Sequence, residues 1–267
     1  MTEQKHNEKL KNLVNSSGFP LQIGLAHQID LTRQSHGWRI LLTEHPWQHP
    51  ETSENGFIDL VVENHCETQV MVIECKRVRD TEWLFLIPKE NPNLRAVANT
   101  WITYLQGDNT RKFNWTNLSP DPTSYQSEFC VVHGQDPKAK PMLERVAAQL
   151  VDSTEAFALE EYQIRNLNQN LFRIYANVIV TTAEIKVCKF KPDDIDLATG
   201  EIAATNFETV PWVRFKKSLT TRSAKLTAAK HVAEMAKENE RTVFVVHSEH
   251  FIEFLEQWDP NVKPELL

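Results

Sequence analysis

The chain has 267 residues, of which 41% are hydrophobic and 24% charged, and its formal net charge at pH 7 is −7. This length can bury a substantial core as one large domain or two small ones. The negative charge repels nucleic acid overall, so any such contact requires a local basic patch. Only seven residues are glycine, and no GxGxxG or GxxxxGK[ST] motif occurs, which argues against glycine-rich nucleotide-binding loops.

The cysteine pattern and the N-terminus bear on the compartment. The four cysteines are widely spaced without a CxxC motif, and Cys75 and Cys188 lie in apolar runs where a small buried side chain is expected. This usage favours a reducing compartment. The N-terminal segment is charged, and no apolar run approaches the length of a membrane span. We therefore expect a soluble cytoplasmic protein without a membrane partner.

Hydrophobic periodicity and helix-start signals predict an alternation of helices and strands in the first part of the chain. Pro20 suits the first turn of the second helix, which Ser17 or Gly18 would precede. The predicted order is a helix at 3–14, a helix at 16–32, a strand at 37–45, strands at 57–62 and 70–76, a helix at 94–106, a loop at 114–126, a strand at 128–134 and a long helix at 140–161.

The remaining sequence predicts an α+β arrangement. Residues 171–190 form one long strand or a hairpin bent near Thr181 and Thr182, and residues 165–170 are the one plausible domain boundary. We therefore divide the chain into a core at 1–165 and an α+β extension at 166–267, packed on the core or appended to it. The extension is predicted to contain a strand within 208–219, a helix at 223–238, a strand at 242–247 and a helix at 249–258.

Two neighbouring strands carry charge where a core strand should not. The strand that begins Val70-Met71-Val72-Ile73 is apolar on both faces, yet it ends with Glu74 and Lys76 on one face. Its predicted partner holds Asp59. If residues 64–69 form a symmetric hairpin loop, Asp59 lies opposite Glu74, with Cβ atoms ~4.5–5.5 Å apart.

Two carboxylates at that distance destabilise each other unless a positive charge lies between them. Mg²⁺ and similar cations prefer hard oxygen ligands and bind through one or two carboxylates and substrate phosphate. The Cys75 backbone carbonyl supplies a further oxygen, and Lys76 would orient or deprotonate a water, or stabilise charge on phosphorus oxygens. Two plain alternatives stay open: an ordinary buried ion pair, or a segment that is not a strand.

These residues resemble the PD-(D/E)XK nuclease superfamily, which has the restriction-endonuclease-like fold. The match consists of "GFIDLVV" with Asp59 and "VMVIECKR" with Glu74, Cys75 and Lys76, and the α-β-β-β-α-β order over about 16–135 is similar to the family core. The resemblance implies a mixed central sheet flanked by helices and metal-dependent phosphodiester cleavage. It implies Asp59 and Glu74 as ligands of Mg²⁺ or Mn²⁺, and Lys76 as the catalytic lysine.

Two departures from the family pattern stand out. The residue before Asp59 is Ile58 rather than proline. Many members carry a glutamate in the first helix that faces the metal, whereas this chain offers Gln22 and His27, and Glu44 is the nearest substitute acid. The number of metals is therefore open, and Gln22 and Glu44 are candidate residues at the rim of the site.

A basic stretch at 209–233 contains no acidic residue. Trp212 and Phe215 interleave with its charges, as base stacking would require. A solvated surface that balances an acidic protein is the plain alternative. The candidate nucleic-acid contacts are Arg77 and Arg79 beside the predicted site and Arg214, Lys216, Lys217, Arg222 and Lys225 in the stretch.

Histidines suggest two weaker metal sites. His247 and His250 lie at a predicted strand-to-helix junction, where Ser248 suits an N-cap, and a structural role is favoured there. His45 and His49 lie in a predicted loop that could border the acidic pair.

The sequence predicts a divalent-metal-dependent endo- or exodeoxyribonuclease, with DNA favoured over RNA as the partner and a homodimer left open. The alternatives are a catalytically inactive module that binds nucleic acid or protein, and an RNA-directed nuclease with the same chemistry.

Overall fold

The computed structural model describes residues 3–49, 53–88, 94–106, 110–135, 141–165, 172–219 and 231–262. The helices are α1 (Glu3–Ser16), α2 (Phe19–His36), α3 (Met142–Arg165), α4 (Val232–Glu238) and α5 (Phe251–Gln257), with short 3₁₀ turns η1 (Pro192–Asp194) and η2 (Ser248–His250). The strands are β1 (Trp38–Gln48), β2 (Asn55–Asn64), β3 (Gln69–Lys76), β4 (Glu82–Pro88), β5 (Ala98–Gln106), β6 (Thr110–Leu118), β7 (Gln126–Ser127), β8 (Cys130–Val132), β9 (Arg173–Thr181), β10 (Glu184–Phe190), β11 (Ile195–Asp196), β12 (Glu201–Ile202), β13 (Asn206–Thr209), β14 (Trp212–Ser218) and β15 (Glu240–His247).

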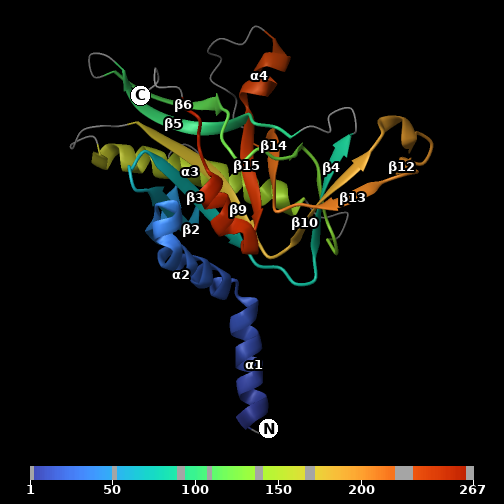
Figure 1. Cartoon of the computed structure of the whole chain (residues 1–267), viewed down its shortest axis with the longest axis horizontal. Coiled ribbons are helices and arrows are strands. Elements are labelled where there is room, and N and C mark those ends of the chain that lie inside the picture. Colours follow the sequence, from blue (N-terminus) through green and yellow to red (C-terminus); the bar gives the residue numbers. More distant parts are fainter. Residues whose placement is uncertain are drawn as a thin grey trace.

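A mixed sheet with the strand order β1-β2-β3-β9-β15-β14-β7 forms the centre of the molecule (Figure 1). Strands β1, β2 and β3 are antiparallel neighbours, whereas β9 runs parallel to both β3 and β15. The first residues of β9 also pair with β5, which continues into the β5–β6 hairpin. The predicted mixed central sheet is confirmed.

Helices cover both faces of this sheet because its central strands are apolar on both sides. Leu60 of β2 and Ile73 of β3 pack with α2 and α5 in one core. Val61 and Val72 face the other way and pack with α3 in a second core. This alternation is the period-2 pattern of strands buried on both faces. The predicted α/β class with helices flanking the sheet is confirmed.

A smaller sheet with the order β13-β10-β4-β8 packs on the α3 side, where Phe85 and Val187 join that core. Strand β10 follows β9 after a turn at Thr182, close to the predicted bend. The two strands are not a hairpin, because β9 belongs to the central sheet and β10 pairs in parallel with β4.

Local signals fix both ends of α2. Gly18 precedes the helix with φ of 85°, and Pro20 occupies the first turn, where its missing N–H has no helical partner to lose. Gly37 ends the helix in the left-handed conformation and donates its N–H to the Arg33 carbonyl. The predicted second helix is thus confirmed, displaced by a few residues towards the C-terminus.

The predicted helix at 94–106 is wrong. Residues 98–106 form β5, in which Thr100, Ile102 and Thr103 are buried. β-Branched residues favour a strand that packs on a sheet over a helix. The loop predicted at 114–126 is also wrong in part, since β6 extends to Leu118. Of the strand predicted at 128–134, only Cys130–Val132 is extended. The α-β-β-β-α-β order therefore does not occur over 16–135.

The C-terminal predictions agree better with the structure. Residues 208–219 contain the end of β13 and all of β14, separated at Pro211, and the strand near 242–247 is β15. The helix predicted at 223–238 is described only as α4, since residues 220–230 lie outside the described ranges. Strands on both sides of the predicted division at 165 share the central sheet, and that division stays a prediction. Within the described residues, no helix combines the length and apolarity needed to cross a lipid bilayer.

Candidate active site

The hairpin of β2 and β3 has the register expected from the sequence. Its observed pairs run from Glu63↔Val70 to Leu60↔Ile73. The next residues along the two strands are Asp59 and Glu74, which the same register places opposite each other. The apolar start of β3 is fully buried, and Glu74 and Lys76 are partly exposed where the strand leaves the core.

Strands β2 and β3 diverge beyond this point. Strand β2 continues with β1 as far as Asn55↔Gln48, and β3 continues with β9 as far as Lys76↔Thr181. The Asp59 carboxylate lies where the ladder ends, and its Oδ2 accepts a 2.6 Å hydrogen bond from the Cys75 backbone N–H. This side chain therefore takes the place of a ladder carbonyl, which fixes its position between the two strands.

A third acid comes from β1. The pairs Thr43↔Leu60 and His45↔Ile58 place Glu44 beside Asp59 across the β1–β2 ladder. Glu44 has φ of 50°, which is uncommon for a residue other than glycine and breaks the regular extended conformation there. Glu44, Asp59 and Glu74 thus occupy corresponding positions on three adjacent strands. The predicted position of Glu44 at the rim of a site stays a prediction.

The electrostatics centre on Asp59. Burial raises the pKa of its carboxyl to about 6, and the nearby Glu74 and, more weakly, Glu44 act in the same direction. The Cys75 N–H and the Lys76 ammonium oppose this effect and favour the ionised form. The arrangement therefore holds a carboxylate that a further cation would stabilise.

Lys76 lies beside Glu74, with 2.5 Å between Nζ and Oε1. Since the two residues are separated by one position in a strand, both project from the same face. Their side chains are 33% and 22% exposed, so both can be reached from solvent. The structure brings together the three residues predicted to carry the chemistry: Asp59, Glu74 and Lys76.

Gln22 contacts the backbone of Asp59. Its buried side chain donates from Nε2 to the Asp59 carbonyl at 2.8 Å, which ties the first turns of α2 to β2. Gln22 therefore lies next to Asp59, and its role at a site stays a prediction. The amide acts on the backbone of Asp59, so Gln22 holds the strand rather than supplying a ligand.

The donor set suits a hard divalent cation through two carboxylates. One oxygen of Asp59 accepts the Cys75 N–H and one oxygen of Glu74 contacts Lys76. Burial raises the pKa of the Cys75 thiol well above its ordinary value, so that this side chain stays protonated and supplies no thiolate. Among the described residues, no three His, Cys, Asp or Glu side chains gather closely enough to hold a metal by themselves. A bound cation would therefore complete its shell with backbone, water or substrate oxygens, as Mg²⁺ commonly does.

Sequence reasoning missed the threonines that anchor the end of β3. Thr182 donates its N–H to the Lys76 carbonyl, and its hydroxyl both accepts from the Val78 N–H and donates to the Val78 carbonyl. These bonds hold the chain directly after Lys76. The sequence did contain a signal for this anchor, because Thr181 and Thr182 stand side by side at the bend predicted within residues 171–190.

The arginines that follow Lys76 are free to meet a ligand. Arg77 is half-buried and Arg79 exposed, and neither side chain forms an ion pair with any residue that the structure describes. Both lie within three residues of Lys76. The contact of these two side chains with phosphate stays a prediction.

The basic stretch differs from its predicted role. Arg214 is fully buried and donates to the Pro120 and Pro122 carbonyls, so the predicted contact with nucleic acid is wrong for this side chain. Burial also lowers its pKa to about 10. Trp212 and Phe215, predicted to stack on bases, are buried in the two cores. Consecutive residues of a central strand point to opposite faces, and both faces here are covered.

The remaining basic candidates are paired or lie outside the described residues. Lys216 contacts Glu240 at 3.1 Å, and Lys217 contacts Glu144 at 3.2 Å and lies over the Phe129 ring. Arg222 and Lys225 fall within residues 220–230, which the structure does not describe.

The histidine pairs do not form metal sites within the described part of the chain. His45 contacts Glu160 of α3 at 2.9 Å, and buried His49 has Glu155 at 3.9 Å. His247 accepts the Glu249 N–H at the start of η2, and His250 contacts Glu253. His45 and His49 thus link the end of β1 and the residue after it to α3, while His247 caps η2 and His250 contacts the first turn of α5. The structural role that the sequence favoured for His247 and His250 agrees with these contacts.

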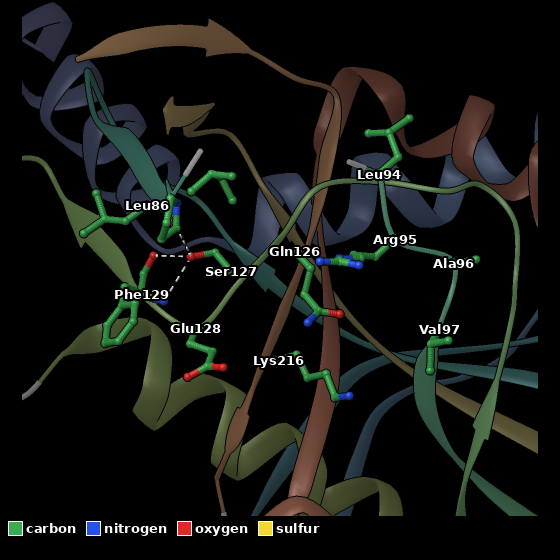
Figure 2. Close-up of a pocket in the computed structure, with 12 residues that line it drawn as sticks. Leu86, Leu94, Arg95, Ala96, Val97, Gln126, Ser127, Glu128, Phe129 and Lys216 are labelled. Atoms are coloured by element: carbon green, nitrogen blue, oxygen red, sulfur yellow. Dashed lines mark hydrogen bonds between the residues drawn. The ribbon is translucent and has the colours of Figure 1, made fainter. Parts of the chain in front are cut away.

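The cavity of about 610 Å³ in Figure 2 is a separate feature. Ser127 bonds to Leu86 and Phe129 in one part of its wall, and Arg95, Gln126 and Lys216 line another (Figure 2). None of Asp59, Glu74 or Lys76 contributes to the wall, so this cavity does not enclose the candidate site.

Comparison with protein-family models, with curated proteins and with solved structures finds no match to this chain.

Proposed function

We propose that this protein is a divalent-metal-dependent nuclease of the PD-(D/E)XK type that hydrolyses phosphodiester bonds in DNA. The observation that carries the proposal is the convergence of Asp59 and Glu74, with Lys76, at the point where β2 and β3 diverge. Two neighbouring carboxylates disfavour each other's ionised form, as Glu74 does for Asp59, and a bound cation would relieve this repulsion.

The chain order supports the proposal. The sequence α2-β1-β2-β3-α3-β9 repeats the α-β-β-β-α-β order of the superfamily core, and β9 lies parallel and next to β3. Strands β4 to β8 then form an insertion between β3 and α3. The fourth strand of the proposed core is therefore β9, rather than the segment at 128–134.

Asp59 and Glu74 are the proposed ligands of Mg²⁺ or Mn²⁺, together with the Cys75 carbonyl, and Glu44 stands at the rim. The bound ion would supply Lewis-acid stabilisation of a phosphoryl oxygen. The Cys75 N–H holds the Asp59 carboxylate in place, while Gln22 holds the backbone behind it.

Lys76 is the proposed catalytic lysine. When substrate enters, its ammonium leaves Glu74 and orients the attacking water or stabilises the charge that develops on phosphorus oxygens. Arg77 and Arg79, which lack ion pairs within the described residues, would bind flanking phosphates. Two charge-assisted contacts next to the reacting group would fix the scissile phosphate in register.

The test is a cleavage assay on single- and double-stranded DNA and RNA of mixed sequence, with Mg²⁺ or Mn²⁺. We expect DNA strand scission that EDTA abolishes and that Lys76→Met lowers at least about a hundredfold. Lys189→Met is the matched control, because Lys189 is also a strand lysine paired with a glutamate, Glu208, but lies in the smaller sheet. If only RNA were cleaved, the proposed chemistry would stand and the substrate would be RNA instead of DNA. Absence of scission in every substrate would refute the proposal.

One observation favours the alternative of an inactive module that binds nucleic acid or protein. The short contact between Lys76 and Glu74 engages one ligand oxygen, and no group of three metal-ligating side chains occurs among the described residues. Binding of nucleic acid by wild type with no metal-dependent scission would support this alternative.

A further inference from the structure

Among the described residues, the N-terminal helix α1 contributes no side chain to a hydrophobic core. It projects away from the remainder of the molecule (Figure 1), and none of its described residues is buried. Isolated helices of about this length are marginal in water, and most helices in proteins are stabilised by packing of an apolar face. Leu10, Leu13 and Val14 form such a face at i, i+3 and i+4, and all three are exposed.

The apolar stripe continues onto α2. Phe19 and Ile23 extend it across the turn at Gly18, and with Leu13 and Val14 they border a hollow of about 390 Å³ at the elbow between the helices. Leu31 lies further along α2. The six side chains, which are 47% to 68% exposed, are Leu10, Leu13, Val14, Phe19, Ile23 and Leu31.

We propose that this surface joins two copies of the chain, with α1 of each copy packed antiparallel along α2 of the other. Reciprocal packing of this kind makes a closed two-fold contact in which both stripes are covered. At 1.5 Å per residue α1 is about 21 Å long and α2 about 27 Å, so one helix can lie along the other for its full length.

The exposed area fits a dimer interface. Half-exposed side chains of this size present on the order of 100 Å² each, so the stripe supplies roughly 600 Å² of apolar surface per copy. A stable interface takes about 800 Å² from each partner. The polar residues that flank the stripe would have to supply the remaining area of about 200 Å² per copy.

The charges on the two surfaces are complementary. α1 carries Lys5, Lys9 and Lys11 against two glutamates. The exposed charges of α2 and of the neighbouring η2 and α5 are mainly acidic. Arg33 of α2 is outnumbered by Asp30 of α2, Glu249 of η2, and Glu253 and Glu256 of α5. Antiparallel packing with Leu13 on Ile23 places Lys9 opposite His27 of the second copy and within one helical turn of Asp30. Attraction between Lys9 and Asp30 would favour this direction of packing.

The test is sedimentation velocity and light scattering of the full chain over a wide range of concentration. We expect a species with twice the monomer mass of 30.9 kDa. The double variant Leu13→Glu, Ile23→Glu should weaken the dimer at least about a hundredfold, since two apolar contacts per copy are lost. Leu197→Glu is the matched control, because Leu197 is 94% exposed in a distant turn, and it should remain dimeric.

A charge-reversal pair tests the direction of packing. Lys9→Glu should weaken the dimer, and adding Asp30→Lys should restore it. Circular dichroism checks that each variant keeps its fold, which substitution of exposed residues should not disturb. A wild type that stays monomeric, an unchanged dimer in the double glutamate variant, or a failure of Asp30→Lys to restore association would each overturn the proposal. A monomer that binds anionic vesicles through α1 would assign the stripe to a membrane surface instead.

Discussion

Asp59 serves two roles that oppose each other energetically. Its carboxylate accepts the Cys75 N–H and so completes the end of the β2–β3 ladder, yet burial and the adjacent Glu74 disfavour its charge. Carboxyl groups whose pKa is strongly shifted by burial and a neighbouring charge occur preferentially at functional sites. The substitution at this residue should therefore separate stability from activity.

Asp59→Asn should stabilise the metal-free protein at neutral and alkaline pH. The pKa of Asp59 in the folded protein is about 6, above its ordinary value of 3.8, so the folded state binds this proton more tightly than the unfolded chain does. The carboxyl therefore favours folding at low pH, and this contribution is lost as the pH rises through 6. Asparagine retains an oxygen for the Cys75 N–H and removes the charge.

We expect the free energy of unfolding of Asp59→Asn to exceed that of wild type by about 1–2 kcal/mol near pH 8. This difference is smaller than the free energy that corresponds to the whole pKa shift, because the carboxyl group is partly exposed and solvent screens its charge. The difference should disappear near pH 4, where wild type is protonated. Urea unfolding at the two pH values measures it. A destabilised variant at pH 8 would show that the charge is already neutralised within the protein.

At the scale of elements, the site was predictable from local pattern. Alternation along β3, with Glu74 and Lys76 after an apolar start, placed both side chains on one face, and the symmetric hairpin gave the register that the structure shows. The role of Gln22 was not predictable, since a glutamine that bonds to a distant backbone carbonyl has the same sequence signal as any polar residue on a helix. The strand β5 was missed because "LRAVANTWITYLQ" also has apolar residues at helical spacing.

Arg173 at the start of β9 links three elements. Its guanidinium contacts Glu161 of α3 and lies 2.9 Å from Glu63 of β2, and both arginine and Glu63 are buried. Arg173→Met should lower the free energy of unfolding by about 3–5 kcal/mol, because two buried carboxylates lose a partner. Urea unfolding measures this loss. Arg39→Met is the matched control, since Arg39 contacts the same Glu63 from a side chain that is 38% exposed, and it should cost at most about 1 kcal/mol.

The segment directly after β3 should carry the phosphate contacts. Arg77→Gln and Arg79→Gln should each weaken DNA binding and lower the slope of log affinity against log salt by about one. Fluorescence anisotropy in Ca²⁺ measures binding without cleavage. Arg145→Gln, an exposed arginine of α3, should leave the slope unchanged. An unchanged slope in both Arg77 and Arg79 variants would place the nucleic acid elsewhere.

At the scale of the whole molecule, the central sheet depends on pairings between distant segments. β3 pairs with β9, about a hundred residues later, and β9 pairs with β15 beyond the predicted domain boundary. No local pattern specifies which distant strand fills an open edge. The sequence therefore indicated a mixed sheet, but the predicted strand at 128–134 contributes β8 to the smaller sheet, and β9 lies beside β3. The burial of Arg214 was missed for the same reason. The sequence of a basic strand indicates an exposed surface, and the elements that cover this strand come from distant segments of the chain.

Under the proposed function, a cation bound at Asp59 and Glu74 is responsible for phosphodiester cleavage. The most direct measurement is a Mn²⁺ titration in which calorimetric binding and DNA strand scission are followed on the same preparation. We predict that one metal affinity describes both curves in wild type and that both signals are lost in Asp59→Asn, while Glu128→Gln, at an exposed acid on a loop, retains them. Scission that persists in Asp59→Asn, or Mn²⁺ binding that this substitution leaves unchanged, would contradict the account.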